Sequence, residues 1–176
     1  IKPDHSWKLA DSIQLLFTTH HTQGLTKVGQ FYFLSAVKVN QWPRKYDIPV
    51  DGYDRDQGDG IGYLFKFDAK GQLVDSVQLG KGKIYHPGGI DFDGRHIWIP
   101  VCEYRPKGKS IIYRIHPETL QTEIVTHIDD AIGAVACNRQ TKELVGMNWG
   151  SRIFYTWKIN DSNGSPQAVF QPNKVR

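Results

Sequence analysis

The sequence is poor in cysteine and methionine and has no long hydrophobic run. Its two cysteines, Cys102 and Cys137, are too few for a disulfide framework or a zinc site of their own, so we expect two buried thiols. A disulfide between them would instead indicate an oxidising compartment, as for a secreted or periplasmic protein. The longest apolar runs, such as residues 97–102, have strand length and fall short of the ~20 residues of a membrane helix. We therefore expect a soluble chain without a membrane span.

An excess of charge of one sign is also lacking. The 22 Lys and Arg residues and the 18 Asp and Glu residues are interleaved along the chain and leave a net charge of +4. A nucleic-acid interface would gather basic residues on one face with aromatic residues between them. The densest basic run, residues 105–109, is expected at a hairpin tip, so no nucleic-acid partner is predicted.

The chain begins at Ile1 and lacks the positively charged and apolar segments of a signal peptide. This start favours a processed protein or a segment of a longer one. The compartment stays open on the sequence alone.

Aromatic residues and glycine are abundant. Five Trp, eight Tyr, eight Phe and 17 Gly residues, against one Met, favour short twisted strands and tight turns over helices. The predicted fold class is all-β.

A repeated unit is visible along the chain. In three places a turn that contains glycine precedes a predicted strand. Further along the chain, each of these turns is followed by another predicted strand, which contains an aromatic, a basic and an apolar residue in that order. The glycines are Gly24, Gly89 and Gly133, and the later strands begin at Phe65, Tyr113 and Trp157. Both landmarks recur after about 44 residues between the second and third copies, the length of a four-stranded propeller blade.

These spacings predict a β-propeller segment of about three four-stranded blades. The blades are expected at residues 20–80, with a long insertion at 41–60, and at 81–128 and 129–176. Residues 8–15 match residues 72–79 at five of eight positions, so residues 1–19 are expected to form the outer strand of a preceding or closing blade. Because three blades cannot close a ring, we expect further blades from a longer native chain, six in all; association of copies is the alternative.

The run from His86 to Pro100 carries a Pro-x-Gly-Ile type of turn, an Asp-Gly hairpin and an Ile-Trp-Ile strand. It resembles blades of NHL-type and gluconolactonase-like propellers. Through His20-His21-x-Gln23-Gly24, residues 52–55 and this run, nearly the whole chain resembles an uncharacterised bacterial and fungal propeller family, domain of unknown function 6454, which implies the fold and no activity. The blade motif also resembles streptogramin-lyase propellers, which use a histidine and magnesium, but no catalytic residue can be aligned.

The residue three positions before each recurring glycine is expected to point toward the central channel. These residues are His21, His86 and Asp130. Two imidazoles and a carboxylate could act as catalytic groups, with one imidazole as a general base, or hold a divalent metal such as calcium, magnesium or zinc. The alternative is that they bond only to neighbouring backbone or to channel water.

The insertion is expected to cover the channel mouth. Trp42, Tyr46 and Tyr53 could stack on a sugar or another flat ligand. Its carboxylates between Asp51 and Asp59 lack the order and the later glutamate of a calcium loop. A plain ordered loop over a sheet edge is the alternative.

The leading functional hypothesis is a propeller that binds a small, carbohydrate-like molecule at the channel mouth. Its rival is a metal-dependent hydrolase or lyase, lactonase-like, that uses the same His and Asp ring. A protein-interaction platform with an inert channel is the third. A bound divalent metal would distinguish the second hypothesis from the other two.

Overall fold

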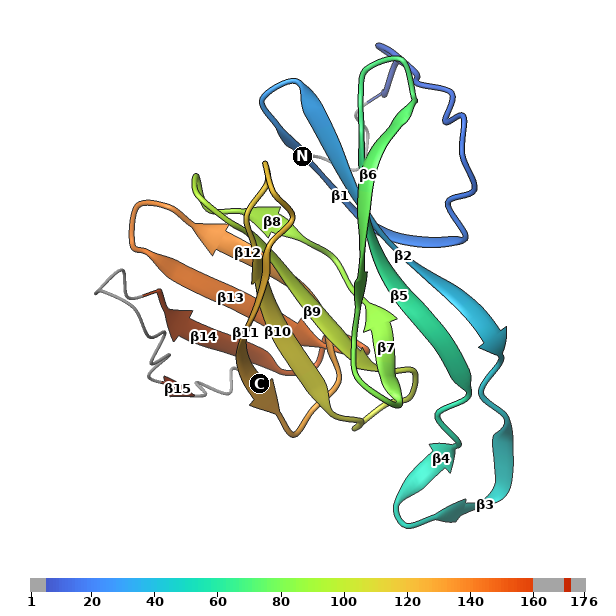
Figure 1. Ribbon diagram of the computed structural model, residues 1–176. Coiled ribbons are helices and arrows are strands. Elements are labelled where there is room, and N and C mark those ends of the chain that lie inside the picture. Colours follow the sequence, from blue (N-terminus) through green and yellow to red (C-terminus); the bar gives the residue numbers. More distant parts are fainter. Residues whose placement is uncertain (1–5, 160–169, 172–176) are drawn as a thin grey trace.

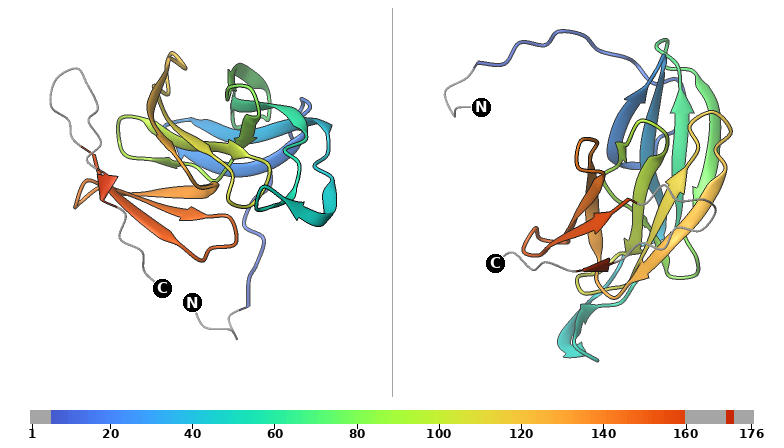
Figure 2. Two further views of the ribbon diagram at one scale, coloured as in Figure 1. Left: turned by 90° about the horizontal axis from the view of Figure 1, so that it is seen from below. Right: turned by 90° about the vertical axis from the view of Figure 1, so that its left-hand side faces the viewer.

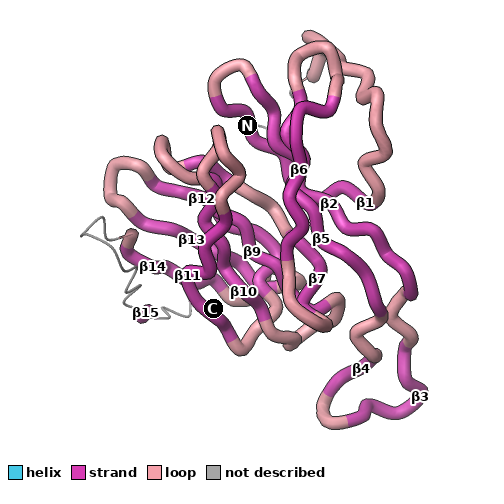
Figure 3. The backbone as a smooth tube through the Cα atoms, in the orientation of Figure 1, coloured by secondary structure: helices cyan, strands magenta, loops and turns pink. Residues whose placement is uncertain are grey.

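A computed structural model describes residues 6–159 and 170–171. Every regular element in these residues is a β-strand, and the backbone in Figure 3 contains no helix in the described part. The all-β prediction is confirmed. No helix capable of crossing a membrane was found among the described residues.

The strands form three antiparallel sheets in which most neighbours in the sequence are also neighbours in space (Figure 1). The first sheet consists of β1 (His21–Val28), β2 (Phe31–Gln41), β5 (Asp59–Phe67) and β6 (Leu73–Leu79). The second consists of β7 (Ile84–Pro87), β9 (Ile97–Glu103), β10 (Ser110–Ile115) and β11 (Thr122–Ile128), with β8 (Asp91–Phe92) also paired to β9. The third consists of β12 (Ile132–Asn138), β13 (Glu143–Asn148), β14 (Phe154–Lys158) and β15 (Phe170–Gln171). A separate hairpin, β3 (Lys45–Val50) and β4 (Tyr53–Arg55), projects from the first sheet between β2 and β5.

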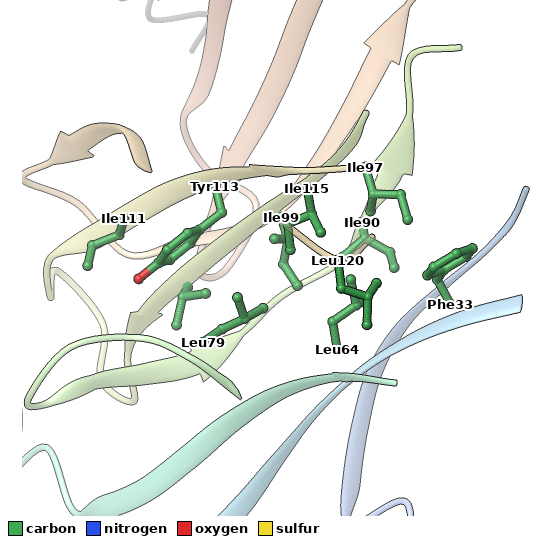
Figure 4. Packing of buried hydrophobic residues seen from close by; sticks show 11 residues of the cluster. Phe33, Leu64, Leu79, Ile90, Ile97, Ile99, Ile111, Tyr113, Ile115 and Leu120 are labelled. Carbon is green, nitrogen blue, oxygen red and sulfur yellow. The ribbon is translucent and has the colours of Figure 1, made fainter. Parts of the chain in front are cut away.

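The second sheet is sandwiched between the other two (Figure 2). Because successive side chains of a strand point to opposite faces, Ile97 and Ile99 of β9 pack toward the first sheet, whereas Trp98 packs toward the third. Every residue of β9 is buried. Figure 4 shows the larger core, where Leu64 and Leu79 of the first sheet meet isoleucines of the second. Both faces of this sheet are therefore apolar.

The recurring glycines lie where the first strands of neighbouring sheets touch. The Gly89 amide donates a hydrogen bond to the Gly133 carbonyl (2.9 Å), and the Val135 amide donates one to the Gly89 carbonyl (3.1 Å). On the other side, a Cβ added to Gly24 would lie 2.8 Å from the Gly89 Cα. The backbones thus approach too closely for a side chain at Gly24 and Gly89, whereas Gly133 has room for one.

The segment before β1 forms no strand in its described part, residues 6–20. Ile13, Leu15 and Phe17 pack on the outer face of the first sheet, where Phe17 lies 5.4 Å from Phe65 between ring centroids. A strand needs an open sheet edge with which to pair. The role of residues 1–19 as an outer strand of another sheet stays a prediction, and residues 1–5 lie outside the described residues.

Both cysteines are free. Cys102 is buried and Cys137 is half-buried. The expectation of two thiols is confirmed, although the second is less buried than expected.

The glycine contact predicts a stability effect. Gly24→Ala places a methyl group against backbone atoms of Gly89 and Ile90, each 2.8 Å away, and should lower the free energy of unfolding by about 1–3 kcal/mol. Urea denaturation measures the difference.

The matched control is Gly133→Ala, because the atoms nearest to its added Cβ are 3.9 Å away. This variant should keep nearly the wild-type stability. Equal stability of the Gly24→Ala variant and the wild type would show that the sheets do not meet as closely as described.

Candidate functional site

A pocket opens at one end of the three sheets. It has a volume of about 290 Å³ and is lined by residues from β1, β7, the end of β9 and the turn between β13 and β14. The lining residues are His21, Gln23, His86, Cys102, Tyr104, Gly133, Met147, Asn148, Trp149, Gly150 and Ser151. All three sheets contribute to it because their first strands converge at the glycine contacts.

Aromatic rings dominate this pocket. The His86 ring lies 4.0 Å from Tyr104 and 6.1 Å from His21 between centroids. Tyr104 and Trp149 are stacked at 5.5 Å. Trp42 lies 6.0 Å from both His21 and Tyr104 and remains 59% exposed. Together the five rings form an aromatic cluster with faces suited to a flat or ring-shaped ligand.

Three of these rings occupy one repeated position. Trp42, Tyr104 and Trp149 each follow directly the last residue of the second strand of their sheet, counting β2, β9 and β13. Each sheet therefore places one aromatic side chain at the same end of the structure. Of these three residues only Trp42 was predicted from the sequence, and aligning the residue after each second strand would have revealed Tyr104 and Trp149.

His86 is the most unusual titratable group of the pocket. Its side chain is buried, and burial, followed by the nearby His21, lowers its pKa to about 4. Its Nε2 atom has no hydrogen-bond partner among the described residues. A buried polar atom without a partner is costly, and this nitrogen is itself buried, so a ligand would reach it only after a neighbouring side chain moves.

Cys102 is paired with His86 across β9 and β7. Burial, followed by the charges of Glu103 and Asp130, raises the pKa of the Cys102 thiol to about 12. A nucleophilic cysteine requires a lowered pKa. The neutral thiol beside a neutral imidazole is therefore unsuited to covalent catalysis.

Asp130 is engaged elsewhere. Its carboxylate accepts hydrogen bonds from the Tyr155 hydroxyl (2.7 Å), the Asn148 side-chain amide (3.0 Å) and the Ala131 backbone amide (2.8 Å). Burial, followed by the hydrogen bond to Asp130, raises the pKa of Tyr155. Asp130 thus sits behind Asn148 and orients that pocket residue.

The structure brings His21 and His86 together and leaves Asp130 outside their pair. No group of three His, Cys, Asp or Glu side chains that could hold a metal ion occurs in the described part of the chain. A divalent metal at these residues stays a prediction.

Of the three aromatic residues predicted to bind a ligand from the insertion, one lies at the aromatic cluster and two lie elsewhere. Trp42 joins the aromatic cluster, whereas Tyr53 lies under the Arg105 guanidinium, 3.3 Å from ring centroid to Cζ. Tyr46 lies on β3, away from the residues that line the pocket. The insertion carboxylates have local partners: Asp54 pairs with Arg55 at 2.8 Å, and Asp59 pairs with Lys83 at 3.2 Å.

Comparison with known proteins places the chain in a family. A family model described as a family of unknown function, DUF6454, matches residues 1–176. The chain belongs to DUF6454. A search of curated proteins gave no match for this DUF6454 chain.

A solved structure of similar fold is a candidate 6-phosphogluconolactonase from Bacteroides uniformis. It aligns with a TM-score of 0.54 at 16% sequence identity, over 99% of the DUF6454 chain and 47% of its own. The chain thus spans about half the length of that protein. At this identity the likeness concerns the fold alone.

The environment of His86 predicts how stability depends on pH. The imidazole binds a proton more weakly in the folded chain, with a pKa of about 4 against an ordinary 6.5. The neutral imidazole therefore contributes fully to the free energy of unfolding above pH 6.5, and this contribution is lost as the pH falls toward 4. The shift corresponds to about 3 kcal/mol. His86→Gln should remove this part of the acid destabilisation, measured by urea denaturation at pH 7.5 and 4.5.

His127 on β11 is exposed and provides the control. His127→Gln should keep the wild-type pH dependence. An unchanged pH dependence in the His86→Gln variant would show that His86 is protonated as readily in the folded chain as in the unfolded one.

Proposed function

We propose that the pocket of this DUF6454 chain binds a small, uncharged ring-shaped molecule of carbohydrate type. The observation that carries the proposal is the convergence of aromatic rings from three sheets: Tyr104 and Trp149 lie beside His86, and Trp42 lies against Tyr104. The Nε2 atom of His86 has no hydrogen-bond partner among the described residues. Aromatic faces bind the apolar faces of sugar rings, while a few placed polar groups fix orientation.

The polar groups of the pocket suit hydroxyl groups. Gln23, Asn148 and Ser151 line it beside the two histidines, and no Asp, Glu, Lys or Arg is among its lining residues. Side-chain amides and hydroxyls both donate and accept hydrogen bonds, as a polyhydroxylated ligand requires. A strongly charged ligand would find no counter-ion on these walls.

The same proposal includes the architecture predicted from the repeat. The three sheets would be blades of a propeller, with the pocket at the mouth of the central channel. Since they align with 47% of the similar structure, a chain of that length built from the same unit holds about six sheets. Further blades would come from a longer native chain and would complete the pocket wall.

A metal-dependent hydrolase or lyase is the second candidate. It is favoured by the two imidazoles at 6.1 Å and the unpaired Nε2 of His86. However, a general base works best with a pKa near the operating pH, and the pKa of His86 lies near 4. Binding therefore ranks before catalysis. Elemental analysis of the full-length protein separates the two, because the hydrolase predicts stoichiometric divalent metal.

Ligand titration tests the binding proposal. Monosaccharides and aldonolactones are titrated while tryptophan emission is followed, and a binding member of the panel should lose about tenfold or more in affinity in the Trp149→Ala variant. His86→Ala should weaken binding of the same ligand, because it removes the hydrogen bond that we propose between Nε2 and the ligand.

The control is Trp7→Ala, since Trp7 is 78% exposed and lies outside the pocket. It should leave affinity unchanged. Failure of the whole panel to bind, or equal binding by the wild type and the Trp149→Ala variant, would reject the carbohydrate pocket. Binding of a protein partner that His86→Ala leaves intact and changes in the β3–β4 hairpin abolish would favour an interaction platform.

A further inference from the structure

A second groove lies at the other end of the first two sheets. It has a volume of about 470 Å³ and is bounded by the turn between β1 and β2, the loop before β9 and the turn after β10. The aromatic pocket is at the start of β1 and the end of β9, so the two sites are separated by the length of these strands. All residues that line the groove lie in the first two sheets and their turns.

Three basic side chains line this groove: Lys66, Arg95 and His116. The ion pairs among the described residues use Arg55, Lys83, Arg105 and Arg114. Lys66 and Arg95 therefore face the groove without a carboxylate partner in the described part of the chain. Glu118 is the one acidic residue on its wall, and it is exposed.

Lys66 is held in place at the bottom of the groove. Its residue exposure is 7%, and its ammonium group donates to the carbonyls of Pro117 (3.0 Å) and Glu118 (3.2 Å). The same group lies 4.6 Å above the Phe31 ring. An ammonium has three donors, and these two carbonyls use two of them. The Phe31 ring lies on another side of the ammonium group, so the group attracts an anion through its positive charge, which little water screens.

A second histidine, His96, lies next to the groove residue His116. His96 lies 6.3 Å from His116 between ring centroids. Burial is the main reason why the pKa of His96 is lowered; the charge of Asp93 raises it, and Arg114, Arg95 and His116 each lower it.

We infer that the groove between Lys66, Arg95 and His116 binds a small molecule that carries a phosphate group, with its apolar part against Phe31 and Phe92. Donors that come from three separate elements suit the tetrahedral phosphate, and a guanidinium at the rim forms paired hydrogen bonds with its oxygens. Phe31 and Phe92 supply apolar wall beside the cations.

Isothermal titration with phenyl phosphate and inorganic phosphate tests this site. Phenyl phosphate should bind saturably with a dissociation constant in the millimolar range or tighter, more tightly than inorganic phosphate, and less tightly as salt is added. Arg95→Gln should weaken it about tenfold or more, and Arg95→Lys should lie between that variant and the wild type. Arg95 is exposed, so these changes leave the fold intact, which circular dichroism checks.

The matched control is Lys70→Gln. Lys70 is an exposed cation in the turn between β5 and β6 and does not line the groove. It should bind phenyl phosphate like the wild type. Trp149→Ala should do the same, so that failure of the carbohydrate pocket and failure of this groove are separate results. Absence of saturable binding, or equal weakening by Lys70→Gln and Arg95→Gln, would overturn the inference.

Discussion

The close approach of backbones at the recurring glycines is the constraint on which the rest of the structure depends. Sheets with two apolar faces must stack, and the stack of three sheets brings their first strands together at Gly24, Gly89 and Gly133. At that point, segments of neighbouring sheets share backbone hydrogen bonds and leave no room for a Cβ at Gly24 or Gly89. Because the first strands are fixed there, the ends of the neighbouring strands are fixed as well.

This geometry accounts for the aromatic pocket. The residue after each second strand emerges at the same end of its sheet, so Trp42, Tyr104 and Trp149 meet although they are far apart in the sequence. His21 and His86 enter from the first strands and complete the walls. Burial then determines the chemistry: it keeps His86 neutral and Cys102 as a thiol. These properties favour binding of an uncharged ring over covalent catalysis.

The two ends of the sheets differ in charge. The pocket with Trp149 has no Asp, Glu, Lys or Arg on its walls, whereas the groove at the opposite end contains Lys66 and Arg95. Lys66 is buried because carbonyl oxygens and aromatic rings surround its ammonium group. The aromatic, basic, apolar motif predicted that Lys66 lies on a strand. The motif does not show which groups surround the lysine side chain in the folded structure.

The sequence by itself determined the all-β class, the repeated unit and the meeting of His21 with His86, because alternation and spacing are local properties that the chain carries into any packed form. Tertiary structure alone decided which polar residues stay available. Asp130 has the same repeat position as the two histidines, yet Tyr155 and Asn148 occupy its carboxylate. Likewise, no pattern in the sequence indicated that Ile13, Leu15 and Phe17 would pack on the face of the first sheet. Hydrogen-bond partners and burial depend on neighbours that are remote in the sequence, and no local pattern specifies them.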